Sequence, residues 1–164
     1  MKFPSKIAAA AALAALLAAH TASAGSPGAT EAPELRTASP LRISDAWVRA
    51  TPPGAQVAAG YMTIRNTGPA PLRVTGARSD RAGKVQIHSM TMADGQMRMR
   101  EVPDGLAIAP GAQVTLAPGG LHLMLMQLDG PIADGETVAI DLLLDDGSTL
   151  ALQLPARRSP PAAP

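Results

Sequence analysis

The sequence predicts an all-β fold, arranged as a sandwich or a barrel of many short strands. Two observations predict it. Over residues 41–155, hydrophobic residues recur at every second position in short segments, which is the periodicity of half-buried strands. Gly, Pro, Asn and Asp separate these segments at short intervals, with no convincing helical pattern between them. A span of this length is sufficient for one domain with one hydrophobic core.

Each predicted strand ends at a turn signal. The first ends before Pro52-Pro53-Gly54 and the second at Asn66-Thr67-Gly68. Asp94-Gly95 is a two-residue turn of the kind that joins the strands of a β-hairpin. Asp145-Asp146-Gly147 separates the strands of a last hairpin. The predicted strands are residues 41–50, 57–65, 72–77, 84–90, 96–102, 106–109, 113–117, 121–126, 137–144 and 148–154.

Residues 1–24 have the three-part pattern of a secretory signal peptide. Lys2 and Lys6 precede an uncharged run of Ala, Leu and Ile, and Ala22-Ser23-Ala24 is a small-residue cleavage site. We therefore expect an exported, periplasmic protein that is not inserted in a membrane after cleavage. Residues 25–40 are predicted to be a disordered linker, and residues 156–164 a disordered tail, because both are rich in Pro and Ala and lack a hydrophobic period.

Removal of this leader leaves a slightly acidic chain. Loss of Lys2 and Lys6 leaves 12 basic against 13 acidic residues, a net charge of about −1, which argues against nucleic acid as a partner. The remaining aromatic rings are Trp47 and Tyr61, which we expect in the core. The chain has no cysteine, so a disulfide framework and lipid attachment through an N-terminal cysteine are excluded. We expect a monomer.

Residues 119–126 contain the most informative pattern in the chain. Leucine alternates there with residues that can bind a metal, and side chains alternate between the two faces of a strand. Leu121, Leu123 and Leu125 would therefore face the core. His122 would share the opposite face with Met124 and Met126.

A larger set of possible ligands surrounds this strand. Both histidines that remain after residue 24 and six methionines lie within residues 88–126. Thioether sulfur and imidazole favour a soft ion such as Cu(I), whereas a blue-copper site would need a cysteine. Methionines can also fill gaps in a core or form a promiscuous binding surface. The set is His88, Met90, Met92, Met97, Met99, His122, Met124 and Met126.

Other chemistry finds little support, and we do not expect an enzyme. The acidic residues lie mostly at turns, where aspartate hydrogen-bonds the local backbone. The sequence has no nucleophile-elbow pattern, no phosphate-binding Gly-rich loop and no metalloprotease helix motif. The acidic residues considered for paired-carboxylate hydrolysis are Asp129, Asp134, Glu136, Asp141, Asp145 and Asp146.

From Trp47 to about Leu154 the chain resembles the periplasmic copper chaperones called PCu(A)C. The resemblance rests on Pro52-Pro53-Gly54, on residues 58–62, on Asn66, and on the spacing of the His/Met set. The family pattern is His, ten residues, Met, twenty-one residues, His, one residue, Met. Here His88 and Met99 enclose ten residues and His122 and Met124 enclose one, but Met99 and His122 enclose twenty-two. We place the extra residue in the turn around Pro103.

The resemblance implies a cupredoxin-like Greek-key β-sandwich or barrel that binds Cu(I) through His88, Met99, His122 and Met124. It implies delivery of copper to the copper-bearing subunit of cytochrome c oxidase, at its binuclear centre, with a Sco-type thiol protein as a further partner. No histidine follows His122, so a C-terminal Cu(II) site of the kind that some members carry is not expected. The alternative is an exported interaction module whose methionine-rich face binds a partner and no metal.

Overall fold

The alternation in the sequence becomes an alternation in burial along the strands. In β9, Thr137–Leu144, the side chains of Val138, Ile140 and Leu142 are buried, and those of Thr137 and Ala139 are exposed. The computed structural model describes residues 39–161, and its regular elements are all strands. The others are β1 Leu41–Arg49, β2 Val57–Asn66, β3 Leu72–Ser79, β4 Ala82–Ala93, β5 Gln96–Glu101, β6 Leu106–Ile108, β7 Gln113–Leu116, β8 His122–Leu128 and β10 Thr149–Arg157.

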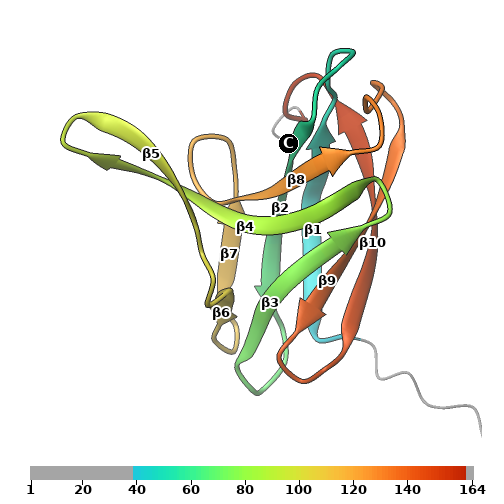
Figure 1. Cartoon of the computed structure of the whole chain (residues 1–164). Helices are drawn as coiled ribbons and strands as arrows, with labels where there is room; N and C mark the ends of the chain where they lie inside the picture. The colour runs from blue at the N-terminus through green and yellow to red at the C-terminus, as the bar shows by residue number, and fades with distance from the viewer. Residues whose placement is uncertain (1–38, 162–164) are drawn as a thin grey trace, which may run out of the picture. The chain divides into compact units, whose positions relative to one another are not determined.

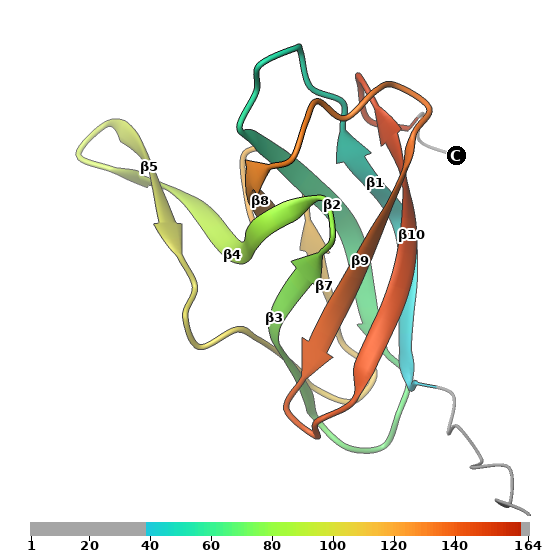
Figure 2. The same ribbon diagram turned by 45° about the vertical axis from the view of Figure 1, so that its right-hand side comes forward.

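Seven strands close into a barrel, shown in Figure 1 and, turned, in Figure 2. Its order is β4, β8, β2, β1, β10, β9 and β3, and pairing of β3 with β4 completes the ring. Neighbours are antiparallel except β1 and β10, which run parallel with Val48 opposite Ala156. This confirms the predicted all-β barrel, and closure removes the sheet edges that would otherwise be open to pairing.

The hairpin of β4 and β5 extends away from the barrel, at the left of Figures 1 and 2. Strand β5 pairs with β4 alone, and every one of its side chains is exposed. The turn between them has positive φ at Asp94 (φ 53) and Gly95 (φ 73), as a tight two-residue hairpin turn requires. The predicted Asp94-Gly95 hairpin is thus confirmed, and its methionines lie outside the barrel core.

The barrel interior is filled by aliphatic side chains from every wall. Val48, Leu125, Ile140 and Leu154 are fully buried members of this one cluster. Trp47 and Tyr61 are buried too, with ring centroids 4.7 Å apart, but they do not belong to the aliphatic cluster. Their burial, with Trp47 3% and Tyr61 7% exposed, confirms the expectation that both rings sit in the core. Near Trp47 the strand carries a bulge, with positive φ at Asp45, which shifts the register of β1 against β2.

Most strand boundaries match the prediction within two residues, and two differ in a way that matters. Strand β4 starts earlier and continues to Ala93, because it supplies one arm of the projecting hairpin. Strand β10 runs to Arg157, and Ala156 is buried, so the domain end predicted at residue 155 is too early.

The signal peptide predicted at residues 1–24 and nearly all of the linker predicted at 25–40 lie outside the described residues. Within residues 39–161 the structure contains no helix long and apolar enough to cross a membrane.

Candidate metal centre

Strand β8 separates the core from the candidate site. Leu123 and Leu125 are buried in the barrel interior, while the alternating His122, Met124 and Met126 belong to its outer face. His122 is nevertheless only 4% exposed. A buried imidazole on the outer face of a barrel indicates that neighbouring elements cover that face locally.

The second histidine lies directly opposite on the next strand. The register of β4 against β8 pairs His88 with His122, and their ring centroids are 5.9 Å apart at an interplanar angle of 66°. Opposite residues of an antiparallel pair share one face. The structure therefore brings together two histidines that are far apart in the sequence.

A hydrogen bond fixes the proton of His122. Its Nδ1 lies 3.1 Å from the carbonyl oxygen of Gly120, and because a carbonyl only accepts, Nδ1 carries a proton; in the neutral ring Nε2 then keeps its lone pair. The same carbonyl accepts the backbone N–H of Met90 at 3.2 Å. The turn that presents Gly120 needs a positive φ of 81° at Gly119, which glycine adopts without strain.

His88 has one nitrogen without a partner. Its Nε2 lies 3.4 Å from Oε1 of Gln86, an acceptor, whereas its Nδ1 is buried and makes no hydrogen bond. Burial of the ring lowers the pKa of His88; His122 and Lys84 lower it further, and Glu101 opposes them. A neutral imidazole with an unpartnered lone pair is the form that binds a metal.

Methionines line the cavity beside His122. This cavity has a volume of about 330 Å³, and Met90, Met99 and Met124 line it together with His122. Met90 and Met99 are opposite each other in the register of the hairpin. Its remaining lining residues, from the end of β1, from β2 and from the turns, are Arg49, Ala50, Thr51, Pro52, Val57, Ala58, Ala59, Tyr61 and Gly119.

Three of the four predicted ligands thus line one cavity, namely Met99, His122 and Met124. The fourth, His88, does not line it and stands next to it through its pairing with His122. Met97 does not line it either, so the structure distinguishes Met99 from its neighbour. Met90 belongs to the larger set of possible ligands but not to the four that the resemblance implies. The two-residue Asp94-Gly95 turn already implies that Met90 faces Met99.

The donor set is soft and uncharged. Among the described residues, no group of three or more His, Cys, Asp or Glu side chains is placed to hold a metal ion. The available donors around the cavity are two imidazoles and three thioethers. Thioether ligands select Cu(I) and comparable soft ions over Mg²⁺ or Ca²⁺, which prefer oxygen.

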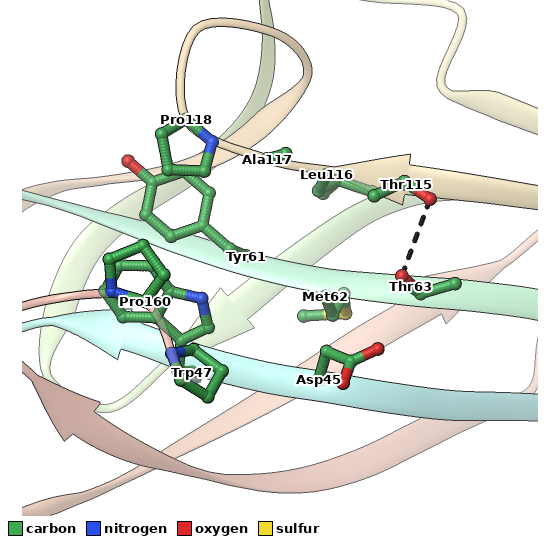
Figure 3. A pocket seen from close by; sticks show the side chains of 11 residues that line it. Asp45, Trp47, Tyr61, Met62, Thr63, Thr115, Leu116, Ala117, Pro118 and Pro160 are labelled. Carbon is green, nitrogen blue, oxygen red and sulfur yellow. Dashed lines mark hydrogen bonds between the residues drawn. The ribbon is translucent and has the colours of Figure 1, made fainter. Parts of the chain in front are cut away.

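A second cavity, of about 360 Å³, lies on the other side of Tyr61. Figure 3 shows the rings of Trp47 and Tyr61 in its wall, with Pro118 and Pro160 also lining it. Thr63 and Thr115 approach each other there, with hydroxyl oxygens 3.5 Å apart. This cavity contains no histidine, and Tyr61 lines both cavities.

Comparison with known sequences places most of this domain in one family. The sequence model described as "Putative lipoprotein LpqE-like" matches residues 41–156. A curated relative, "Putative lipoprotein Lxx21020" of Leifsonia xyli subsp. xyli, is 35% identical over 136 residues, covering 83% of this chain and 76% of the relative.

Solved structures share the fold. The copper-bound PCuAC domain from PmoF2 is similar with a TM-score of 0.60 and 23% identity, covering 73% of this chain and 94% of that domain. The solution structure of CuI-DR1885 from Deinococcus radiodurans gives a TM-score of 0.51 and 34% identity, covering 70% of this chain and 76% of that protein. The cupredoxin-like β fold expected from the sequence is therefore confirmed.

Proposed function

The chain belongs to the LpqE-like family, of the PCuAC type, and from this premise we propose that it is a copper chaperone. It binds one Cu(I) through His88, Met99, His122 and Met124. The observation that carries the proposal is the cavity in which Met99 and Met124 accompany His122, whose Nε2 lone pair is free. The similarity to CuI-DR1885, at 34% identity, supports copper as the ion.

The donors suit an ion that is carried and released. Thioether and imidazole are neutral, so the bound Cu(I) keeps its positive charge and is drawn toward a partner with thiolate ligands. A site without cysteine also avoids thiol oxidation outside the cytoplasm. His88 completes the set from the adjacent strand, because its buried Nδ1 has no other partner.

We further propose where the copper goes. The PCuAC resemblance favours delivery to the binuclear copper centre of cytochrome c oxidase, with a Sco-type thiol protein in the same route. Export follows from the leader pattern of residues 1–24.

The decisive experiment is competition for Cu(I) between the purified protein and bathocuproine. The wild type should retain one equivalent, and the double variant His122→Ala/Met124→Ala should release it while remaining folded. Met126→Leu is the matched control, since Met126 lies on the same face of β8 but does not line the cavity. Undiminished retention in the double variant would reject the proposed ligands.

The alternative function is an interaction module that binds no metal. The exposure of Met92, Met97 and Met99 favours it, because exposed methionines form adaptable binding surfaces. The same titration separates the two functions. Failure of the wild type to retain any Cu(I) would support the interaction module over the chaperone.

A further inference from the structure

Beyond the cavity, the β4–β5 hairpin exposes two methionines at its tip. Met92 is 65% exposed and Met97 is 52% exposed. Neither lines either cavity. Strand β5 has no buried side chain, so packing of the barrel core does not account for a methionine at position 97. The tip methionines are also outside the set of ligands proposed above.

The hairpin register arranges its methionines as two successive pairs. Met92 faces Met97, and Met90 faces Met99, all on one face of the hairpin. Opposite residues have Cβ atoms about 4.5–5.5 Å apart, within reach of a shared ion for two flexible thioethers. Pairs two residues apart are separated by about 7 Å along the strand. The tip pair is therefore one step beyond the pair that lines the cavity.

Other polar groups of the tip belong to the opposite face. Thr91 faces Arg98, and Ser89 faces Arg100, at the alternate register positions. Arg98 forms an exposed ion pair with Asp94, at 3.6 Å. The face that carries Met92 and Met97 thus presents thioethers to solvent. The first carboxylate on this face that could compete for a cation is Glu101, which lies opposite His88, beyond the Met90/Met99 pair.

We propose that Met92 and Met97 form a second, weaker binding site for a soft monovalent ion, from which the ion passes to Met90 and Met99 in the cavity. The passage is a ligand exchange. Bonds from the ion to the Met99 and Met90 sulfurs form as bonds to the tip sulfurs break. Bonds to His88, His122 and Met124 then replace the bond to Met90, with no change of oxidation state and no proton transfer. The passage rests on the proposed copper function; binding at the tip does not.

The test is a titration of the purified protein with silver(I), a soft ion without redox chemistry, followed through the methyl signals of ¹³C-methyl methionine. The first equivalent should shift Met99 and Met124. A later, weaker equivalent should shift Met92 and Met97. Met62, which is buried in the core, is an internal reference and should not shift. The Met92→Leu/Met97→Leu variant should bind one equivalent fewer, with the affinity of the first unchanged.

A matched control changes the other face of the same hairpin. Thr91→Val/Arg98→Lys leaves all four thioethers in place and should retain the second equivalent. The proposal is overturned if Met92 and Met97 do not shift, if they shift together with the first equivalent, or if the leucine variant keeps the second equivalent. Unmoved Met99 and Met124 signals would instead count against the cavity site, so the two failures are distinguishable.

Discussion

At the scale of single residues, the Gly120 carbonyl organises the site. It accepts the Nδ1 proton of His122 and the backbone N–H of Met90, and so orients the imidazole and anchors the start of the hairpin with one atom. A histidine held in one tautomer presents its other nitrogen in a fixed direction. The outer face of β8 is therefore preorganised before any ion arrives.

Replacement of each β5 methionine by leucine, one at a time, tests which of the two sulfurs is a ligand. Met99→Leu removes a sulfur that lines the cavity, so we expect Cu(I) affinity to fall about tenfold or more, equivalent to roughly 1.4 kcal/mol. Met97→Leu should leave the affinity of this first site unchanged, because Met97 does not line the cavity. Both side chains are about half exposed, so stability should change by less than about 0.5 kcal/mol. A larger loss in the Met97 variant would show that the assumed register of ligands is wrong.

His88 should make the stability of the metal-free protein depend on pH. Burial, helped by His122 and Lys84 and opposed by Glu101, lowers its pKa in the fold, whereas the unfolded chain has a histidine pKa of about 6.5. Below about pH 6.5 the unfolded chain therefore binds more protons than the native state. The free energy of unfolding should fall as pH drops through 6.5 toward the lowered pKa.

Urea unfolding of the metal-free protein between pH 7.5 and pH 5 measures this effect. His88→Gln removes the titrating group and should flatten the profile in that window. Parallel profiles for the wild type and the variant would contradict the assignment to His88.

At the residue scale, the sequence predicted which side chains of β8 face the core, but not the burial or the pairing of the histidines. The Leu/His/Met alternation of β8 assigned Leu123 and Leu125 to the core and His122 and Met124 to the other face, as the structure has them. Burial of His122 could not be predicted, because it depends on which elements pack over the outer face of β8 in the folded protein. The pairing of His88 with His122 depends on which strands become neighbours, and local periodicity does not specify that.

At the scale of elements, the β4–β5 hairpin is an appendage of the barrel. Its register follows from Asp94-Gly95 alone, so the pairing of Met90 with Met99 was predictable from the turn. Its departure from the barrel was not predictable. Strand β4 first pairs with β8 and then continues as the arm that projects with β5 in Figure 1, and only the folded arrangement shows where that change occurs.

Substitution of the glycine in the β4–β5 turn should lower Cu(I) affinity without lowering the stability of the barrel. Gly95→Ala places a side chain at a φ of 73°, a strain of about 1–2 kcal/mol. Because β5 pairs with β4 alone, we expect the midpoint of global unfolding to stay nearly constant. Cu(I) affinity should fall about fivefold, the equivalent of about 1 kcal/mol, since β5 positions Met99.

Gly147→Ala is the matched control for that substitution. Gly147 has a φ of 82° and no atom within 4 Å of the added Cβ, but it joins two barrel strands. Its strain should lower global stability by about 1–2 kcal/mol and leave Cu(I) affinity unchanged. A Gly95 variant that lost as much global stability as this control would show that the hairpin is part of the cooperative core.

At the scale of the whole molecule, the residues that stabilise the barrel and the residues that could bind copper lie in different places. Its interior is a continuous aliphatic cluster, whereas the imidazoles and the cavity thioethers lie outside that cluster. Among the described residues, two polar side chains are buried, His122 at the site and Asn66 in the framework. Asn66, at the end of β2, is fully buried and donates Nδ2 hydrogen bonds to the carbonyls of Ala70 and Ile108, at 2.8 and 3.0 Å.

Asn66 should therefore stabilise the barrel without influencing copper. Its Oδ1 also accepts the backbone N–H of Gly68 at 2.9 Å, so Asn66→Ala removes three hydrogen bonds to backbone groups. An unsatisfied buried group costs about 1–3 kcal/mol, and we expect a loss of about 2–4 kcal/mol in the free energy of urea unfolding. The cavity contacts the other end of β2, at Val57 to Tyr61, and five residues of strand span about 16 Å.

Cu(I) affinity of Asn66→Ala, measured under conditions where the variant is fully folded, should therefore equal that of the wild type. Thr67→Ala is the control, because it removes an exposed hydrogen bond from the same turn, from Thr67 Oγ1 to the Pro40 carbonyl, and should cost about 1 kcal/mol or less. If Asn66→Ala weakened copper binding while folded, the closed barrel would transmit strain along β2 to the cavity. The separation of the buried framework from the outer face would then be wrong.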